Sequence, residues 1–335
     1  MTTQSGALIT TGGSAIVGQR EDLSDIISRI DPVSTPALSW FGTGTAKNAI
    51  SHDWETVSPR APRRSPANEG NVATNGTAKR ATRIANTCEI FYEAYGVSGT
   101  AQSVDVAGGA GDLDFQRTIK GLELRSDLEI SVLSPYSWVK TDPRNMGGIQ
   151  TYGVNYDIGS SGGTGPSADG DTDVVYGADQ TLDVDMVDTV AQSGWAVGAN
   201  YSLLIMGSAQ KRNFDNAIPV ESLADAQIDV TNQDGVTVAT TVAIWKSVFG
   251  QRKFMMVPTL DKFTEAWADK FFLGFDERSE YRPKVCFLPG RSWFVEPLAK
   301  VGDTDQEQIV AEATLEVPNP QSFMLCAGLS ESYSS

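Results

Sequence analysis

Residues 112–133 read DLDFQRTIKGLELRSDLEISVL, which is the longest helical pattern in the chain. The residues of this stretch recur at the three- and four-residue spacing of an α-helix and form two largely apolar stripes. One stripe holds Phe115, Ile119, Leu122, Ser126, Glu129 and Leu133, and the other holds Leu124, Leu128 and Val132. A helix of this length is a rod of about 33 Å. We predict that a sheet covers one stripe and that the N-terminal segment and the base of a projecting arm cover the other.

The ends of this helix carry the usual signals. Asp112 is a suitable N-cap, and Pro135 lies just beyond the last turn. Arg125 and Glu129 stand four residues apart, so we expect them to pair along an exposed edge, worth about 0.2–0.5 kcal/mol. The side chains show no arrangement typical of catalysis, which indicates a structural role for the helix.

The composition describes a loop-rich, folded protein. The chain has 335 residues, of which 40% are hydrophobic, with 32 Gly and 15 Pro. This length suffices for one large domain or two moderate ones. No apolar run approaches 18 residues, and the first residues lack the pattern of a signal peptide. Cys88, Cys286 and Cys326 are odd in number and widely spaced, which favours free thiols in a reducing compartment over disulfides.

Charge is distributed unevenly along the chain. The net charge is −16, yet one stretch carries six basic residues against one acidic residue: Arg60, Arg63, Arg64, Glu69, Lys79, Arg80 and Arg83. Between Arg144 and Lys211 the only charged residues are eight aspartates. The basic stretch suits a solvated loop, a nucleic-acid contact or the acidic surface of another copy. Because the acidic bulk repels DNA and no aromatic residue lies between Trp54 and Phe91 for base stacking, we predict that these seven residues form an intersubunit contact.

The basic stretch lies within an extended excursion. Residues 52–57 predict a short strand, residues 59–82 offer no apolar pair to bury, and residues 86–100 predict a second β run. We therefore expect a long two-stranded arm with a basic tip. Such a hairpin is not stable alone, so it needs a partner surface.

The other elements predict a mixed α+β fold. We expect helices at 21–30, 182–194 and 208–214, a turn of helix after Thr35-Pro36, one or two turns at 263–272, and an irregular loop at 157–177. We expect strands at 201–206, 253–258, 285–288, 293–295, 309–317 and 322–327, and a hairpin formed by 226–231 and 236–245.

Three patterns suggest chemistry but do not satisfy its requirements. Gly159 to Gly163 fit G-x-S-x-G, yet Gly165 and Pro166 prevent the helix that a nucleophile elbow needs. Asp169, Asp171 and Asp173 begin like a calcium loop, but the sixth and twelfth positions hold Val and Gln. His52 is the only histidine, and with three distant cysteines it makes a poor zinc pattern. There is no P-loop and no G-x-G-x-x-G. We predict no catalytic, cofactor-binding or metal-binding residue; a soluble hydrolase using His52 is the enzymatic alternative.

Three segments in sequence resemble one protein family. They are REDLSDIISRIDPVSTPALSWF at 20–41, residues 100–134 with KGLELRSDLEISVLS, and FVEPLAKVGDTDQEQIVAEATLEV at 294–317. Together with VSGT at 97–100, they are similar to the major capsid (major head) proteins of tailed bacteriophages with the Hong Kong 97-type fold. The resemblance covers about residues 20–329.

The resemblance implies a map of the chain. Residues 1–47 would form the N-arm and 48–104 the extended β E-loop. Residues 105–145 would hold the spine helix of the peripheral domain, 146–235 the axial domain, 236–308 peripheral-domain strands and a connection, and 309–335 C-terminal strands shared by both domains.

The resemblance also implies a function. The protein would be a non-enzymatic capsid protein that self-assembles into hexamers and pentamers of an icosahedral head. The head would assemble in the host cytoplasm and enclose double-stranded DNA without sequence-specific contact. Further partners would be a separate scaffolding protein, a portal and decoration proteins, with no membrane, no cofactor and no Lys–Asn crosslink. The alternative within the fold is an encapsulin-like compartment.

Overall fold

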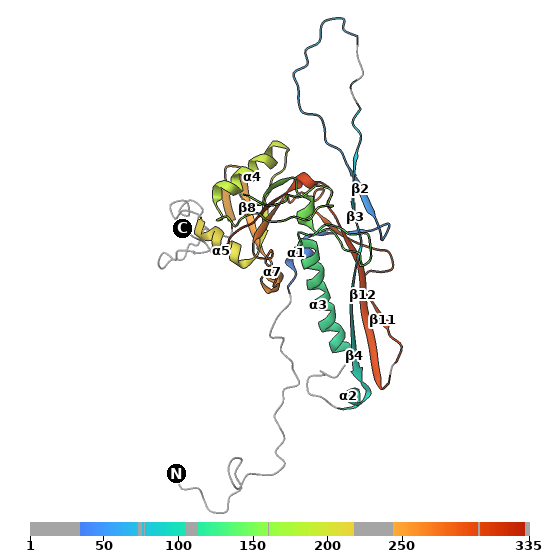
Figure 1. Ribbon diagram of the computed structural model, residues 1–335. Coiled ribbons are helices and arrows are strands. Elements are labelled where there is room, and N and C mark those ends of the chain that lie inside the picture. The colour runs from blue at the N-terminus through green and yellow to red at the C-terminus, as the bar shows by residue number, and fades with distance from the viewer. Residues whose placement is uncertain are drawn as a thin grey trace, which may run out of the picture.

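The computed structural model describes residues 34–72, 76, 78–104, 113–159, 161–217, 244–300 and 302–331. These residues form two sheets, a long helix beside one of them and a two-stranded arm that projects from the body (Figure 1). The arm leaves the molecule near the C-terminal end of the long helix, whereas the short helix α2 (Gly99–Ser103) lies at the opposite end. The mixed helix and strand content agrees with the predicted α+β class.

The first sheet is built around one long strand. β12 (Thr304–Glu316) pairs antiparallel with β4 (Glu89–Ser98), β10 (Lys284–Phe287) and β11 (Phe294–Pro297). β1 (Gly42–Thr45) adds to β10 in parallel, so part of the predicted N-arm belongs to this sheet.

The second sheet has the strand order β5-β13-β9-β6-β8-β7. Its strands are β5 (Asn155–Asp157), β6 (Leu203–Met206), β7 (Ile244–Ser247), β8 (Gly250–Met256), β9 (Phe271–Phe275) and β13 (Phe323–Ala327). The helices α4 (Val184–Ala196) and α5 (Ser208–Ala217) lie over this sheet (Figure 1). Every residue of β6, β9 and β13 is buried, as their continuous apolar runs require.

The predicted long helix is confirmed as α3 (Leu113–Leu133). The stripe of Leu124, Leu128 and Val132 is buried in the main core, and α3 contacts both β4 and β12. The expected exposed pair of Arg125 and Glu129 is wrong, because Glu129 is fully buried and faces the helix α1 (Pro36–Trp40). The predicted N-cap, Asp112, lies outside the described residues.

The predicted two-stranded arm is present as a hairpin of β2 (His52–Thr56) and β3 (Thr82–Asn86), which pair antiparallel, but its second strand was expected at 86–100 and lies instead before residue 87. The predicted β run at 86–100 is divided: β3 ends at Asn86, β4 begins at Glu89, and α2 follows from Gly99.

Several other predicted elements differ from the structure or lie outside the described residues. The helical turns expected at 263–272 are wrong, because the helix there is α7 (Pro258–Lys262) and residues 271–275 form β9. Short 3₁₀ helices cover Ile149–Tyr152 and Pro320–Ser322. The segment 236–308 contributes strands to both sheets. The predicted helix 21–30 lies outside the described residues, as does the predicted hairpin 226–245 except for the start of β7. None of the described helices combines the length and the apolar character needed to span a membrane.

Candidate interaction surface

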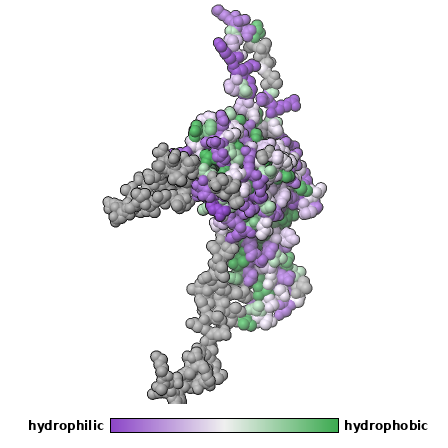
Figure 2. Space-filling view, turned by 60° about the vertical axis from the view of Figure 1, so that its left-hand side comes forward, coloured by the Kyte–Doolittle hydropathy of each residue, from purple (hydrophilic) through white to green (hydrophobic). Residues whose placement is uncertain are grey.

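The tip of the arm is the most exposed part of the described chain. Every described residue from Val57 to Arg83 is exposed, and this stretch carries no helix or strand before Thr82. Figure 2 shows mostly hydrophilic residues over the described part of the tip. The predicted contact residues all lie on this projection: Arg60, Arg63, Arg64, Glu69, Lys79, Arg80 and Arg83.

These basic residues fall into two kinds. Arg83 forms an ion pair with Asp53 across the hairpin, and this guanidinium lowers the pKa of the Asp53 carboxyl. Arg60 donates to the neighbouring Ala61 carbonyl at 3.0 Å. For Arg63, Arg64, Lys79 and Arg80, no ion pair with another described residue is found. Their charges therefore remain available to a partner, whereas that of Arg83 is engaged within the arm.

The base of the arm is held by Asn86, a residue that sequence reasoning did not select. Asn86 is fully buried, and its Nδ2 donates to the Leu315 carbonyl at 2.8 Å and to the Gly147 carbonyl at 3.2 Å. Its Oδ1 accepts from the Gly147 and Thr87 amides at 2.9 and 2.8 Å. One side chain thus ties β3 to β12 and to the loop after α3.

A second contact at the base uses Glu316, the last residue of β12. Its Oε2 lies 3.1 Å from His52 Nε2, and its Oε1 accepts from Lys284 Nζ at 3.0 Å. The hydrogen bond from His52 and the charge of Lys284 hold the pKa of Glu316 at about 2, against the opposing effect of burial. Cys286 Sγ lies 3.6 Å from the same Oε2, and burial raises its pKa to about 12.

Two further carboxylates of β12 connect other elements. Glu312 is buried between Arg144, at 3.5 Å, and Arg291. Glu307 accepts from Arg117 of α3 at 2.8 Å and from the Tyr95 hydroxyl of β4 at 2.7 Å. Apolar and polar residues alternate from Ala311 to Val317, and both faces of β12 are buried from Ile309 to Leu315.

Glu129 is a carboxylate of α3 that connects this helix to other helices. Its Oε1 accepts from the amides of Ala37 and Leu38 at 2.8 and 3.2 Å, and its Oε2 accepts from the Thr259 hydroxyl. The amides belong to the first turn of α1, whose N-cap residue Thr35 makes no capping bond of its own. Glu129 therefore supplies the cap from another helix. Burial raises the pKa of this carboxyl above its ordinary value.

An acidic seam, defined as Glu93, Glu123 and Asp127, lies where α3 meets β4. Among the described residues, the cation that pairs with it is Lys120, whose Nζ lies 3.0 Å from Glu93 and 2.8 Å from Glu123. Partial desolvation, followed by the charges of Glu93 and Glu123, raises the pKa of Asp127, although this residue stays in contact with solvent. Among the described residues, the seam therefore has three carboxylates against one ammonium group, so its net charge is negative.

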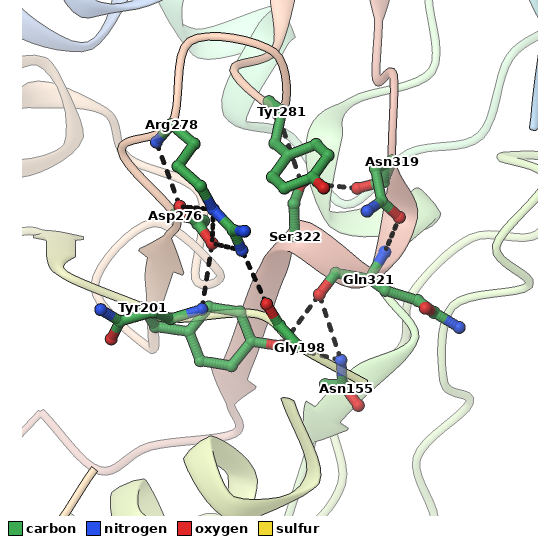
Figure 3. Close-up of polar contacts among 10 residues, drawn as sticks. Asn155, Gly198, Tyr201, Asp276, Arg278, Tyr281, Asn319, Gln321 and Ser322 are labelled. Atoms are coloured by element: carbon green, nitrogen blue, oxygen red, sulfur yellow. Dashed lines mark hydrogen bonds and ion pairs between the residues drawn. The ribbon is translucent and has the colours of Figure 1, made fainter. Parts of the chain in front are cut away.

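The second sheet has an open hollow of about 760 Å³ at one end. It is lined by Trp195, Gly198, Ala199, Asn200, Ser202, Asp276, Glu277 and Arg278. Figure 3 shows the bonds that shape it: Arg278 pairs with Asp276 and donates to the Gly198 carbonyl at 2.7 Å. Burial alone would raise the pKa of Asp276, but Arg278 and two amides lower it. The polar groups are thus paired with one another, which is typical of a structural network.

In the described residues, neither the G-x-S-x-G pattern nor the aspartates at 169, 171 and 173 form an arrangement suited to catalysis or calcium binding. Gly159, Gly162 and Gly163 lie in the irregular loop after β5, and in the described part of the chain no helix follows them before α4. Asp173 accepts from the Ser137 amide at 2.7 Å, and Asp171 accepts from Thr172. Among the described residues, the only group of potential metal ligands is His52, Cys286 and Glu316. That group combines β2, β10 and β12, so sequence spacing gave no signal for it.

Comparisons with known proteins give one family. A family model described as SU10 major capsid protein matches residues 3–330. Among curated proteins no significant match is found.

Solved structures share the fold at low sequence identity. A chain from Gordonia phage Cozz is 12% identical with a TM-score of 0.57, covering 98% of both chains. The cyanophage A-1(L) capsid is 11% identical with a TM-score of 0.59, over 93% of this chain and 97% of that one. The SrpI encapsulin of Synechococcus elongatus is 8% identical with a TM-score of 0.53, over 92% and 95%. At such low sequence identities the matches show only a shared fold. That fold is the predicted Hong Kong 97-like one.

Proposed function

Because this chain belongs to the SU10 major capsid protein family, we propose that its basic arm tip binds the acidic seam of a neighbouring copy and thereby closes the capsid shell. The protein is a structural, non-enzymatic phage capsid protein, present in many copies in the virion. This family membership removes the hydrolase alternative built on His52. The proposal concerns the contact between neighbouring copies.

We extend the proposal to the whole particle. The copies form hexamers and pentamers of an icosahedral head that assembles in the host cytoplasm around double-stranded DNA, with a separate scaffolding protein, a portal and decoration proteins as further partners. The sheet of β12 with α3 forms the peripheral domain, and the sheet of β9 with α4 and α5 forms the axial domain. The E-loop, implied above for residues 48–104, is narrowed in this proposal to residues 52–86, because β4 pairs with β12 in the first sheet.

One observation carries the proposal: the tip displays four basic side chains, Arg63, Arg64, Lys79 and Arg80, without an ion pair among the described residues. The acidic seam offers three carboxylates against the single Lys120. Each exposed pair contributes only about 0–1 kcal/mol. A closed shell repeats the contact at every neighbour, so many weak pairs combine through effective concentration.

Charge reversal tests the contact. Replacing Arg60, Arg63, Arg64 and Arg80 by Glu is expected to leave a folded subunit that forms no shells, because like charges then meet at the interface. Circular dichroism checks the fold and negative-stain electron microscopy checks assembly. Normal shells from this variant would show that the tip charges are not the contact.

A reciprocal change identifies the partner surface. Adding Glu93→Lys, Glu123→Lys and Asp127→Lys to the reversed tip is expected to restore shells, since attraction returns with opposite signs. The seam changes alone serve as the matched control and are expected to block assembly. If they leave assembly intact, the tip binds elsewhere. Loss of DNA from otherwise normal particles of the reversed tip would instead favour a nucleic-acid contact.

The contents of the particles decide between the two shell types. A phage head is expected to hold double-stranded DNA, and an encapsulin-like compartment would hold protein cargo. Nuclease-protected DNA in purified particles distinguishes them.

A further inference from the structure

Three potential metal ligands meet where the arm joins the first sheet. His52 opens β2, Cys286 lies in β10, and Glu316 closes β12. Their ligand atoms all lie within 4.8 Å of one another, with Oε2 of Glu316 3.1 Å from His52 Nε2 and 3.6 Å from Cys286 Sγ. The ligands of one tetrahedral Zn²⁺, at about 2.0–2.3 Å from the ion, stand roughly 3.3–3.8 Å apart. The three atoms therefore need only small side-chain movements to share an ion.

We propose that His52, Cys286 and Glu316 form a binding site for one Zn²⁺-like transition-metal cation that fastens the arm to the sheet. Imidazole nitrogen, thiolate sulfur and carboxylate oxygen together suit Zn²⁺ or Co²⁺, whereas Mg²⁺ and Ca²⁺ prefer oxygen ligands alone. With three protein ligands, a water completes a tetrahedral shell.

The surroundings support this assignment. The His52 and Cys286 side chains are buried, so strand pairing fixes their positions before a cation arrives. Lys284 donates to Oε1 of Glu316 at 3.0 Å and leaves Oε2 directed at the other two ligands. Such a second partner on a ligating carboxylate is the usual way in which proteins orient it.

A cation that binds here has to displace the proton of the Cys286 thiol, because the thiolate and not the thiol ligates a metal. Hydrogen bonding from His52 and the charge of Lys284 keep Glu316 ionised, with a pKa of about 2. Burial and Glu316 keep the Cys286 thiol protonated, and Cys88 adds to this effect while Lys284 opposes it. A bound divalent cation lowers the thiol pKa, so the proton passes to solvent as the metal–sulfur bond forms.

The expected consequence is a stiffer arm. The cation connects β2 of the arm to β10 and β12 of the sheet, in addition to the Asn86 contacts. The tip is connected to the body only through the base of the arm. A cation that holds the base in place therefore reduces the range of directions in which the tip can point. This inference concerns the isolated subunit and is independent of what the tip binds.

Cobalt absorption tests the site directly. Adding Co²⁺ to the metal-free, reduced full-length chain is expected to give a thiolate-to-cobalt charge-transfer band that saturates at one equivalent and disappears when Zn²⁺ is added. Hydrogen exchange of the β2 amides is expected to slow with Zn²⁺. A folded chain that shows no such band overturns the proposal, whatever the variants do.

Matched variants locate the ligands. Cys286→Ala is expected to abolish the band, and Cys326→Ala is expected to keep it, although both thiols are fully buried. His52→Gln, which retains a hydrogen-bond donor, is expected to weaken Co²⁺ binding. A band that survives Cys286→Ala and disappears with Cys326→Ala would also overturn the assignment.

Discussion

The ionised Glu316 makes the stability of the arm base dependent on pH. His52 and Lys284 hold its folded pKa at about 2, below the ordinary value of 4.5. The unfolded chain therefore binds a proton more readily, so this contribution is present above about pH 4.5 and is lost as the pH falls towards 2. A shift of this size corresponds to at most about 3 kcal/mol.

We expect Glu316→Gln to lose less stability than the wild type between pH 6 and pH 3, since the amide does not titrate. Urea unfolding in the presence of a chelator measures this, and Glu280→Gln, at an exposed site, is the control for net charge. Parallel pH profiles for Glu316→Gln and the wild type would contradict the prediction. Glu129 has the opposite pH dependence. Burial raises its folded pKa above the ordinary value, so the stability that its protonated carboxyl contributes is lost as the pH rises above that value.

Single residues were the least predictable level of this protein. Asn86 and Glu129 are polar residues in a strand and a helix, and their local sequence favours solvent for both. Their partners lie far away in the chain: Leu315 is 229 residues from Asn86, and Thr259 is 130 residues from Glu129. Only the folded chain reveals that each one satisfies several buried backbone or hydroxyl groups.

At the scale of elements, Glu129 joins three helices through one carboxylate. We expect Glu129→Ala to destabilise the protein by about 2–3 kcal/mol, because the first-turn amides of α1 and the Thr259 hydroxyl of α7 are left buried without an acceptor. Glu129→Gln keeps an acceptor oxygen and is expected to cost less than about 1 kcal/mol. Urea unfolding compares the two variants, and equal losses would show that packing, and not capping, joins α1 to α3.

Helices and strands could be predicted from the sequence where a single hydrophobic period extended over the whole segment. The 3.6-residue pattern predicted α3, and alternation predicted the end of β12, because each has a long uniform environment. At 263–272 the apolar residues Phe263, Trp267 and Phe271 stand four apart, which favoured a helix. In the folded chain residues 271–275 form a strand between β13 and β6, buried on both faces, where tertiary packing decides the conformation.

At the scale of the molecule, the core and the exposed arm tip are different parts of the chain. The body contains both sheets and the core, whereas the tip buries none of its described side chains between Val57 and Arg83. The sequence predicted this division, because residues 59–82 lack apolar residues in pairs. It could not predict the direction of the arm, which depends on contacts from β12 and from the loop after α3.

A shortened arm separates folding from assembly. Thr56 and Thr82 are paired across β2 and β3, so replacing residues 57–81 by Asn-Gly joins them through a two-residue turn that suits a hairpin. We expect the free energy of unfolding to change by less than about 0.5 kcal/mol, because every described side chain among the deleted residues is exposed. We also expect no shells, as judged by analytical ultracentrifugation and electron microscopy. A full-length arm with Gln at Arg60, Arg63, Arg64, Lys79 and Arg80 is the control that separates charge from shape: it should assemble poorly at physiological salt, since its pairs with the seam are lost. Shells from the shortened chain would mean that the body alone carries the contacts between copies, and that the exposed tip serves some other partner.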